Sequence, residues 1–391
     1  MKNNTNIIGA LVITDSYTGL GIIRSLGRKG VPVWVVGGKF SVAGASRYTQ
    51  HITEFGASDE SQKINFLVEL AKQNNLKNWV LFPDSDKNAG LIARNYNALA
   101  EYYLLTVPAW DTLEWAFNKR QTYELANRVG IPFPKTFYPA SRSEVEAITG
   151  NFPMILKPAH HQGEDLFSIG RAWKADNQAE LLDLYDRAAK FADPSVIMIQ
   201  EMIPGGSSTQ LSFACICKNG KILASAVAER KRLLPADFGV GAYIETIDKP
   251  ELKPLAQKWL EKINYTGLAE IDFKFDEREN NYKILDVNAR PWGWLAMCPK
   301  AGVDFAFLMW QLAQGIEITS AEARPGVRWI RTPYDFMAAL QGLASGSLSL
   351  KEYFASLKNA DHEMYAADDL LPVIAEIPLL AKLVWNKINN T

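Results

Sequence analysis

The sequence predicts an α/β domain, then an α+β region, and then a mostly helical extension. Up to about Pro108, buried apolar runs alternate with amphipathic segments, which is typical of a parallel sheet with helices on its faces. After Asp111 the strands come in pairs, and one pair is joined at Asn219-Gly220, a strong hairpin signal. After Gly315 the pattern is mostly helical. We therefore place the domains at 1–112, 113–315 (lobes 113–200 and 201–315) and 316–391.

Length and charge narrow the class of protein. The chain has 391 residues, 48% of them hydrophobic, which is enough for two or three domains with sizeable cores. Its formal net charge is -1, so it lacks the basic excess that nucleic-acid-binding proteins carry. No apolar run approaches membrane-spanning length, and the short N-terminal run is typical of a strand rather than of a signal peptide. We expect a cytoplasmic protein.

The three cysteines are too few for a disulfide framework in a chain of this length. Cys215 and Cys217 share one face of a predicted strand, and we interpret them as small buried hydrophobic residues. A redox or metal pair is the alternative, but no further Cys or His lies nearby in the sequence. This cysteine usage indicates a reducing compartment.

The first domain is predicted to have strands at 6–14, 31–37 and 78–83, with helices at 17–30 and 60–76. In such sheets, ligands bind where the strands end. Gly19 and Gly21 follow the first strand as a GxG, but Arg24 replaces the third glycine of a dinucleotide fingerprint, which argues against a nicotinamide site. A structural turn and an anion site at the helix N-terminus both stay open. Asp84 and Asp86 would either orient an amine or hydroxyl or cap the next helix.

The middle domain begins with a predicted helix at 118–130, and after it strands and helices alternate less regularly. We expect strands at 152–158 and 195–203, a helix at 177–192 and a hairpin at 208–232. Two further strands follow, and their composition is unusual.

Charged and amide side chains lie on one face of each of these last two strands. The stretch "ILDVNARPWGW" places Asp286, Asn288 and Arg290 at every second position, with apolar residues between them. Such alternation is the signature of a strand with one face in the core. The preceding stretch "AEIDFKFD" alternates in the same way, with Glu270 and Asp272 on its polar face.

An antiparallel pairing of the two stretches brings their carboxylates together. Pairing Asp276 with Tyr282 sets Lys274 beside Ile284, Asp272 opposite Asp286 and Glu270 opposite Asn288; directly opposed residues have Cβ atoms roughly 5 Å apart. Facing carboxylates repel, and a divalent cation such as Mg²⁺, which prefers hard oxygen ligands, would remove that cost. Arg290 would then reach a phosphate or a developing oxyanion. The alternative is a solvated strand face with a slipped register.

With these strands in place, the sequence resembles the ATP-grasp carboxylate–amine ligases that carry a preceding Rossmann-like (preATP-grasp) domain. Biotin carboxylase, carbamoyl-phosphate synthase and D-alanine–D-alanine ligase belong to this superfamily, and the resemblance is greatest to its D-aspartate-ligase-like branch. It covers roughly Thr5 to Gly315. The implied fold is a Rossmann-like domain, an ATP-grasp domain of two α+β subdomains, and a helical C-terminal extension.

The resemblance also implies roles for individual residues. Those expected to bind Mg²⁺ (or Mn²⁺) are Asp272, Asp286 and Asn288. Those expected to bind ATP are Lys119 in "FNKRQT", Lys157 in "PMILKP", and Glu201 with the backbone of Met202 and Ile203 at the adenine. Those expected to act on the transferred phosphate or the intermediate are Arg290 and Arg230.

Each of these assignments has a structural alternative. Lys119 is otherwise a helix-surface lysine, Glu201 merely the end of a strand, and Arg230 part of a solvated basic patch. Lys157 lies among apolar residues and there needs an anionic partner. The loop after Lys157 departs from the family, because it has one central glycine and two histidines, His160 and His161, where glycine or serine usually covers the phosphates.

The function that the resemblance implies is an ATP-dependent ligase that joins a carboxylate to an amine through an acyl-phosphate, with an amino acid as one substrate. One alternative couples the amino acid or amine to a cell-envelope precursor or polysaccharide. It rests on the amphipathic segment 371–390, which contains Trp385 and could lie on a membrane surface or pack on the protein itself. A degenerate ATP-binding regulatory module is the third reading. We expect small-molecule substrates, no nucleic acid, and a possible homodimer.

Overall fold

The computed structural model describes residues 7–56, 59–159, 172–236 and 238–378. Its first domain is a parallel sheet with the strand order β3-β2-β1-β4-β5. Its elements are β1 (Ala10–Ile13), α1 (Tyr17–Arg28), β2 (Val33–Val36), β3 (His51–Thr53), α2 (Glu60–Asn74), β4 (Trp79–Pro83), α3 (Asp86–Arg94), α4 (Tyr96–Ala100) and β5 (Tyr103–Leu105). The predicted strands and helices are confirmed. Because the strand order reverses between β1 and β4, a crevice for ligands opens at the carboxyl ends of these two strands.

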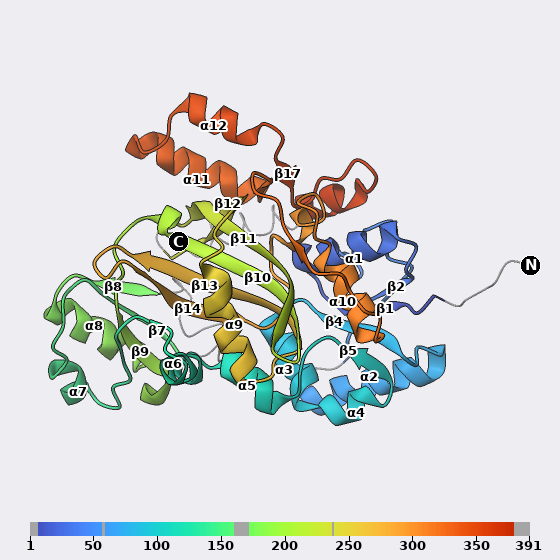
Figure 1. Cartoon of the computed structure of the whole chain (residues 1–391), viewed down its shortest axis with the longest axis horizontal. Coiled ribbons are helices and arrows are strands. Elements are labelled where there is room, and N and C mark those ends of the chain that lie inside the picture. Colours follow the sequence, from blue (N-terminus) through green and yellow to red (C-terminus); the bar gives the residue numbers. More distant parts are fainter. Residues whose placement is uncertain (1–6, 57–58, 160–171, 237, 379–391) are drawn as a thin grey trace, which may run out of the picture.

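A second, antiparallel sheet forms a small lobe with the strand order β6-β9-β7-β8. The elements from the first domain through this lobe are α5 (Trp110–Phe117), α6 (Lys119–Arg128), β6 (Thr136–Phe137), α7 (Arg142–Glu146), β7 (Met154–Pro158), β8 (Trp173–Ala175), α8 (Gln178–Ala188) and β9 (Ile197–Glu201). Leu181 and Tyr185 of α8 pack with Met154 and Leu156 of β7. Figure 1 shows this lobe on the side of the large sheet away from the first domain.

The third sheet is the largest, with eight strands among the described residues in the order β14-β13-β10-β11-β12-β16-β17 and with β15 beside β11. Its elements are β10 (Gln210–Lys218), β11 (Lys221–Leu234), β12 (Val240–Ile247), α9 (Leu252–Lys262), β13 (Gly267–Asp276), β14 (Asn281–Asn288), α10 (Phe305–Ala313), β15 (Ala321–Glu322), β16 (Arg328–Ile330), α11 (Thr332–Ser345), α12 (Leu350–Leu357) and β17 (Asp361–His362). The hairpin between β10 and β11 turns at Asn219-Gly220, where both residues have positive φ angles, as predicted.

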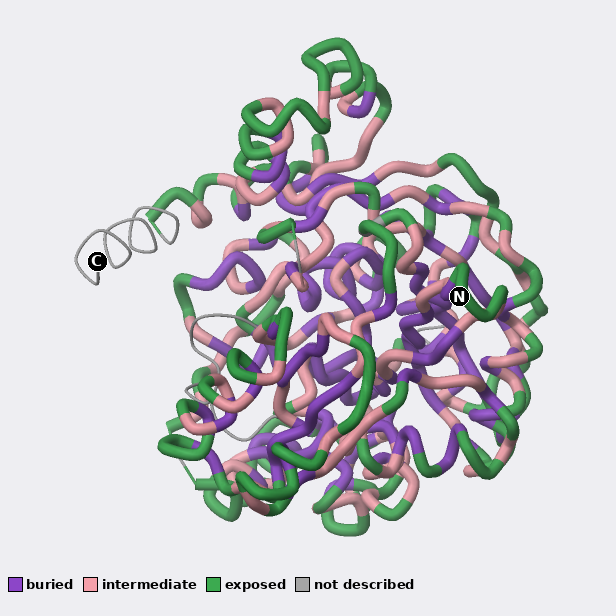
Figure 2. The backbone as a smooth tube through the Cα atoms, turned by 90° about the vertical axis from the view of Figure 1, so that its left-hand side faces the viewer, coloured by how far each residue is buried: buried purple, intermediate pink, exposed green. Residues whose placement is uncertain are grey.

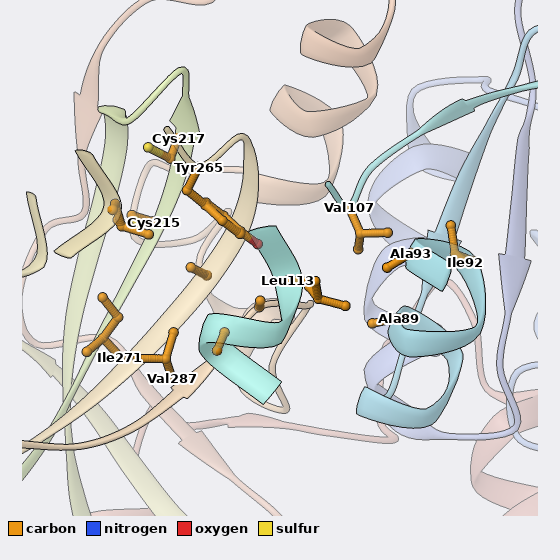
Figure 3. Packing of buried hydrophobic residues seen from close by; sticks show 14 of the residues in the cluster. Ala89, Ile92, Ala93, Val107, Leu113, Cys215, Cys217, Tyr265, Ile271 and Val287 are labelled. Atoms are coloured by element: carbon orange, nitrogen blue, oxygen red, sulfur yellow. The ribbon is translucent and has the colours of Figure 1, made fainter. Parts of the chain in front are cut away.

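The two faces of the large sheet are buried in different hydrophobic clusters. Phe213, Cys215 and Cys217 point into the cluster that contains α9, whereas Ala214 and Ile216 point into the cluster that contains α10. The first of these clusters continues through Leu113 of α5 to the helices of the first domain, as Figure 3 shows. The first domain and the large sheet therefore share one core, and their mutual position is fixed.

The cysteines are part of these cores. Cys215, Cys217 and Cys298 are buried and form no disulfide. Burial raises the pKa of each thiol, which keeps the thiols protonated. This confirms our interpretation of Cys215 and Cys217 as buried hydrophobic residues.

The C-terminal region contains both helices and strands. Helices α11 and α12 and the helical residues 371–378 agree with the prediction, but β15, β16 and β17 join the large sheet beyond Gly315. The extension is therefore mostly helical, as predicted, and the three added strands were missed because strands of two or three residues are too short to show a periodic pattern. The second half of the predicted segment 371–390, with Trp385, lies outside the described residues.

Candidate active site

A cavity of about 1210 Å³ lies between the carboxyl edge of the first sheet and the polar face of the large sheet. From the first domain, Ser16, Asp84 and Asp86 line it, at the crevice where the strand order reverses. From the large sheet, the lining includes residues of β11, β13 and β14 that the sequence singled out, namely Arg230, Asp272, Asp286, Asn288 and Arg290. The structure thus gathers five of the ten predicted site residues around one cavity.

The two acidic strands, β13 and β14, pair as predicted where they line the cavity. Asp272 lies opposite Asp286, and Glu270 lies opposite Asn288. Beyond Asp272 the register shifts by one residue, so that Phe273 pairs with Ile284 and Leu285 is passed over. A β-bulge of this kind adds one unpaired residue to one strand.

The rest of the predicted register was therefore wrong. Lys274 lies opposite Lys283 rather than Ile284, and Asp276 lies opposite Asn281 rather than Tyr282. The bulge falls within the apolar run Ile284-Leu285, where alternation gives no sign of an extra residue.

Each of the two facing carboxylates is neutralised by a cation. The guanidinium of Arg230 donates to both oxygens of Asp272 at 2.6 Å, and Ser212 Oγ donates to the same carboxylate at 2.7 Å. The ammonium of Lys119, at the start of α6, donates to Asp286 Oδ1 at 2.5 Å. Carboxylates at directly opposed positions of two strands repel each other, and these cations offset that repulsion.

Arg290 ties the large sheet to the first domain. Its guanidinium forms a bidentate ion pair with Asp86, at 3.0 Å for both nitrogen–oxygen distances, and also donates to Asn288 Oδ1. Asn288 in turn donates to Glu270. A planar guanidinium held in this way keeps a fixed orientation toward the cavity.

Glu270 lines the cavity beside these residues, although the sequence did not place it among the site residues. Its carboxylate accepts hydrogen bonds from Trp294 Nε1 at 2.6 Å and from Asn288 Nδ2 at 3.2 Å. Burial, followed by the charge of Asp272, raises the pKa of Glu270. Its place on the same strand face as Asp272 was the sequence signal that would have identified it.

Lys157, on β7 of the small lobe, is the second predicted ATP lysine. Burial and, after it, the nearby ammonium of Lys119 lower the pKa of Lys157 to about 7, while Asp286 acts in the opposite direction. A partly buried lysine beside a like charge favours an anionic partner. The histidines His160 and His161, which follow β7 in the sequence, lie outside the described residues.

The carboxylate of Glu201 at the end of β9 is engaged by the protein itself. It accepts from Lys283 at 2.9 Å, from Arg278 at 3.1 Å and from the backbone N–H of Lys135 at 3.0 Å. The backbone N–H of Met202 donates to Pro153, and Ile203 is buried. A contact between Glu201 and the exocyclic amine of adenine stays a prediction. To accept from the adenine amine, the carboxylate would have to accept from these three donors at the same time or lose one of them.

Glu201 also belongs to a cluster of three acids whose geometry would suit a metal ion. The other two are Asp276 and Glu279. However, the ammonium of Lys283 lies within 3.0 Å of all three carboxylates and already supplies the positive charge. This cluster is an ion-pair network, buried at Lys283 and Asp276 and open to solvent at Glu279, that joins β9 to the β13–β14 hairpin.

The first-domain edge contains the predicted turn between the first strand and the first helix. A Cβ on Gly19 would lie 2.0 Å from Thr14 Oγ1, so this glycine is required by close packing, which supports the structural turn. Asp84 accepts from the hydroxyls of Thr14 and Ser16, both at 2.7 Å. Neither Asp84 nor Asp86 caps α3, because Ser85 is its N-cap.

Comparison with known proteins agrees with this geometry. Residues 193–333 match a family model described as "ATP-grasp in the biosynthetic pathway with Ter operon". This part of the chain therefore resembles an ATP-grasp domain. Among curated proteins it is similar to the D-aspartate ligase of Enterococcus faecium, at 24% identity over 58% of this chain and 57% of that protein. It is also similar to the carbamoyl-phosphate synthase of Methanobrevibacter smithii, at 24% identity over 45% of this chain and 46% of that protein. The match thus spans about half the length of each curated relative.

Solved structures share the fold across more of the chain. The L-amino acid ligase from Bacillus licheniformis superimposes with a TM-score of 0.62 at 14% identity, covering 78% of this chain and 73% of that one. The biotin carboxylase domain of Hydrogenobacter thermophilus 2-oxoglutarate carboxylase, solved as a dimer with MgADP and bicarbonate, gives 0.63 at 15% identity over 82% and 73%. Among the described residues, no helix is both long and apolar enough to cross a membrane.

Proposed function

We propose that this protein is an ATP-dependent carboxylate–amine ligase that forms an amide through an acyl-phosphate, with an amino acid as one substrate. The observation that carries this proposal is the pairing of Asp272 with Asp286 across two strands, each beside a cation, on the wall of a large cavity. ATP-grasp relatives include a D-aspartate ligase and an L-amino acid ligase, which supports an amino-acid substrate.

The donor set fits Mg²⁺. Asp272, Asp286 and Asn288 would hold it, because two carboxylates and an amide oxygen are the hard ligands that this ion prefers, with water and phosphate oxygens completing its shell. When bound, the ion would supply charge neutralisation at the transferred phosphate.

The chain's own residues would position the nucleotide and the reacting groups. Lys157 and Lys119 would bind phosphate oxygens, and Arg230 and Arg290 would face the charge that develops when the substrate carboxylate attacks the γ-phosphate. That attack forms the acyl-phosphate and releases ADP; the amine then displaces phosphate to give the amide. The edge formed by Ser16 and Asp84 would orient one of the two substrates.

The test is ADP release with Mg-ATP in the presence of amino acids, dipeptides, hydroxy acids, polyamines and uronic acids. We expect one carboxylate–amine pair to stimulate release, and Asp286→Asn to abolish the stimulation. Lys253→Met, at an exposed ion pair outside the cavity lining, is the matched control and should behave like wild type. ATP binding without ADP release under any condition would favour the regulatory reading or an acceptor from the cell envelope. Absence of ATP binding would overturn the site itself.

A further inference from the structure

Asp84 places a buried carboxylate on the wall of the cavity. It directly follows β4, at the crevice where the strand order of the first sheet reverses, and it is 9% exposed. It is one of the buried residues, which Figure 2 colours purple and shows gathered inside the molecule. Because it also lines the cavity, a molecule bound there can contact this carboxylate.

Neutral hydrogen-bond donors hold the Asp84 carboxylate in one orientation. Its Oδ2 accepts from the hydroxyls of Thr14 and Ser16, both at 2.7 Å, and its Oδ1 accepts from Asn88 Nδ2 at 3.0 Å. Thr14 is itself fixed, because Gly19 packs against it and because its hydroxyl oxygen accepts from the backbone N–H of Ser16 at 3.0 Å. A carboxylate offers about four acceptor positions, so these three bonds leave room for a donor from a ligand.

The charge of Asp84 has no cation beside it, unlike the charges of the other aspartates on the cavity wall. Those that pair with a Lys or Arg are Asp86, Asp272 and Asp286. Glu270 lies close to the guanidinium groups of Arg230 and Arg290. Within the described part of the chain, Asp84 forms no ion pair, not even with Lys87 of the same cavity wall. A carboxylate shielded from water and left without a cation attracts a positively charged ligand strongly.

The position of Asp84 relative to Arg290 indicates what such a ligand carries at its other end. Asp86 is two residues further along the chain, so the Cα atoms of the two aspartates are at most about 7 Å apart. Asp86 holds the guanidinium of Arg290 in a bidentate pair at 3.0 Å. A small molecule with its ammonium at Asp84 can therefore direct a carboxylate toward Arg290, where we expect the transferred phosphate. An amino acid has both groups.

We propose that Asp84 binds the ammonium group of the amino acid whose carboxylate is phosphorylated. An ammonium nitrogen has three donors and no lone pair, so an amino group held in this form cannot attack an acyl-phosphate. The amino acid at Asp84 is then the carboxylate substrate, and the attacking amine is a different molecule. This division of roles rests on the proposed ligase function, whereas the ammonium site itself does not. A hydroxy acid binds less well, because it leaves the charge of Asp84 without a cation.

The experiment is titration calorimetry of the whole chain with a non-hydrolysable Mg-ATP analogue present. The titrants are both enantiomers of the standard amino acids and of the hydroxy acids with the same side chains. We expect an amino acid to bind roughly tenfold to a hundredfold more tightly than its hydroxy acid, as is typical of a hydrogen bond between charged groups. Asp84→Asn should remove most of this difference and leave the affinity for the ATP analogue unchanged. Glu114→Gln, which removes another carboxylate from the same cavity wall, is the matched control and should keep the difference.

A second measurement decides the role of the bound amino acid. With Mg-ATP and hydroxylamine in place of the amine, we expect the hydroxamate of this same amino acid, identified by mass spectrometry. The hydroxamate of a different carboxylate, formed while the amino acid at Asp84 stays unmodified, would overturn the division of roles. Binding that Asp84→Asn weakens, without ADP release under any condition, would support the ammonium site and contradict the ligase function.

The ammonium site is overturned if no amino acid binds, or if the hydroxy acid binds as tightly as the amino acid. Both comparisons use the wild-type protein and need no variant. It is also overturned if Asp84→Asn leaves the difference unchanged, or if Glu114→Gln reduces it equally. Equal thermal unfolding midpoints would show that the two variants fold like wild type.

Discussion

Lys157 combines partial burial with a position beside the ammonium of Lys119, and together these lower its pKa. Because burial lowers its pKa in the folded protein to about 7, the unfolded chain binds more protons than the folded one between about pH 7 and pH 10.5. The contribution of Lys157 to the free energy of unfolding therefore rises with pH across that window. Below pH 7 the residue is charged in both states and its burial costs the most stability.

The first prediction concerns this lysine. ATP phosphates beside Lys157 favour its charged form, so ATP binding at pH 8 should take up nearly one proton, and at pH 6 almost none. Titration calorimetry in buffers with different ionisation enthalpies measures this uptake. Lys157→Met should remove the uptake and weaken ATP binding. A buffer-independent enthalpy for the wild type at pH 8 would show that the lysine does not meet the phosphates.

The second prediction concerns Asp86, which holds Arg290 in a bidentate pair across the two domains. Asp86→Asn keeps the size of the side chain but removes the charge and one acceptor, so Arg290 loses its fixed orientation. We expect turnover to fall by roughly tenfold to a hundredfold with little change in ATP affinity, since we propose that Arg290 faces the transferred phosphate and not the rest of the nucleotide. Turnover is measured as ADP release. Equal losses in ATP affinity and turnover would instead mean that Asp86 supports the nucleotide pocket.

At the scale of single elements, the ion-pair network around Lys283 joins β9 to the β13–β14 hairpin. The third prediction is that Lys283→Met destabilises the protein by about 3 kcal/mol, because it leaves Glu201, Asp276 and Glu279 facing one another with one cation fewer. Denaturant unfolding measures this. Lys253→Met, which breaks an exposed pair, should change stability by less than about 1 kcal/mol.

The same network makes stability depend on acid. The hydrogen bonds from Arg278 hold the pKa of Asp276 well below its ordinary value of 3.8. Its contribution to stability is therefore complete above that value and is lost as the pH falls toward its folded-state pKa. Lys283→Met should lessen this acid sensitivity, because one of the groups that lowers the pKa is gone.

The turn between β1 and α1 supplies the fourth prediction. Gly19→Ala places a methyl group against the side chain of Thr14, which itself donates to Asp84 at the cavity edge. We expect a loss of about 1–3 kcal/mol. Gly56→Ala, where an added Cβ meets nothing within 4 Å, is the matched control and should be close to neutral. Similar melting curves for both variants would contradict the packing role of Gly19.

The register of the β13–β14 pair was predicted correctly where the pair lines the cavity and wrongly beyond Asp272. Alternation of polar and apolar residues fixes which side chains share a face, and this placed Asp272 opposite Asp286. A bulge inside an apolar run leaves the alternation unbroken on either side, so the shift at Leu285 was invisible. The hydrogen bond from Lys283 to Glu201 could not be predicted from the sequence either, because it joins residues 82 positions apart.

At the scale of the whole molecule, the site exists only because the domains are packed together. The cavity takes Asp84 and Asp86 from the first sheet and Asp272 and Asp286 from the large one. The order of elements along the chain predicted each sheet, but the pairing of Arg290 with Asp86 depends on how the sheets meet. The strands beyond Gly315 also join the large sheet, so the sheet itself does not mark the domain boundary that we predicted at residue 315.

The central claim is that this cavity makes an acyl-phosphate, and hydroxylamine trapping tests it most directly. With Mg-ATP and each carboxylate in turn, hydroxylamine replaces the amine substrate and captures the acyl-phosphate as a hydroxamate. We expect hydroxamate and ADP in equal amounts with one particular carboxylate, and neither product with Asp286→Asn. ADP release without hydroxamate, from any carboxylate that stimulates it, would exclude an acyl-phosphate made in this cavity.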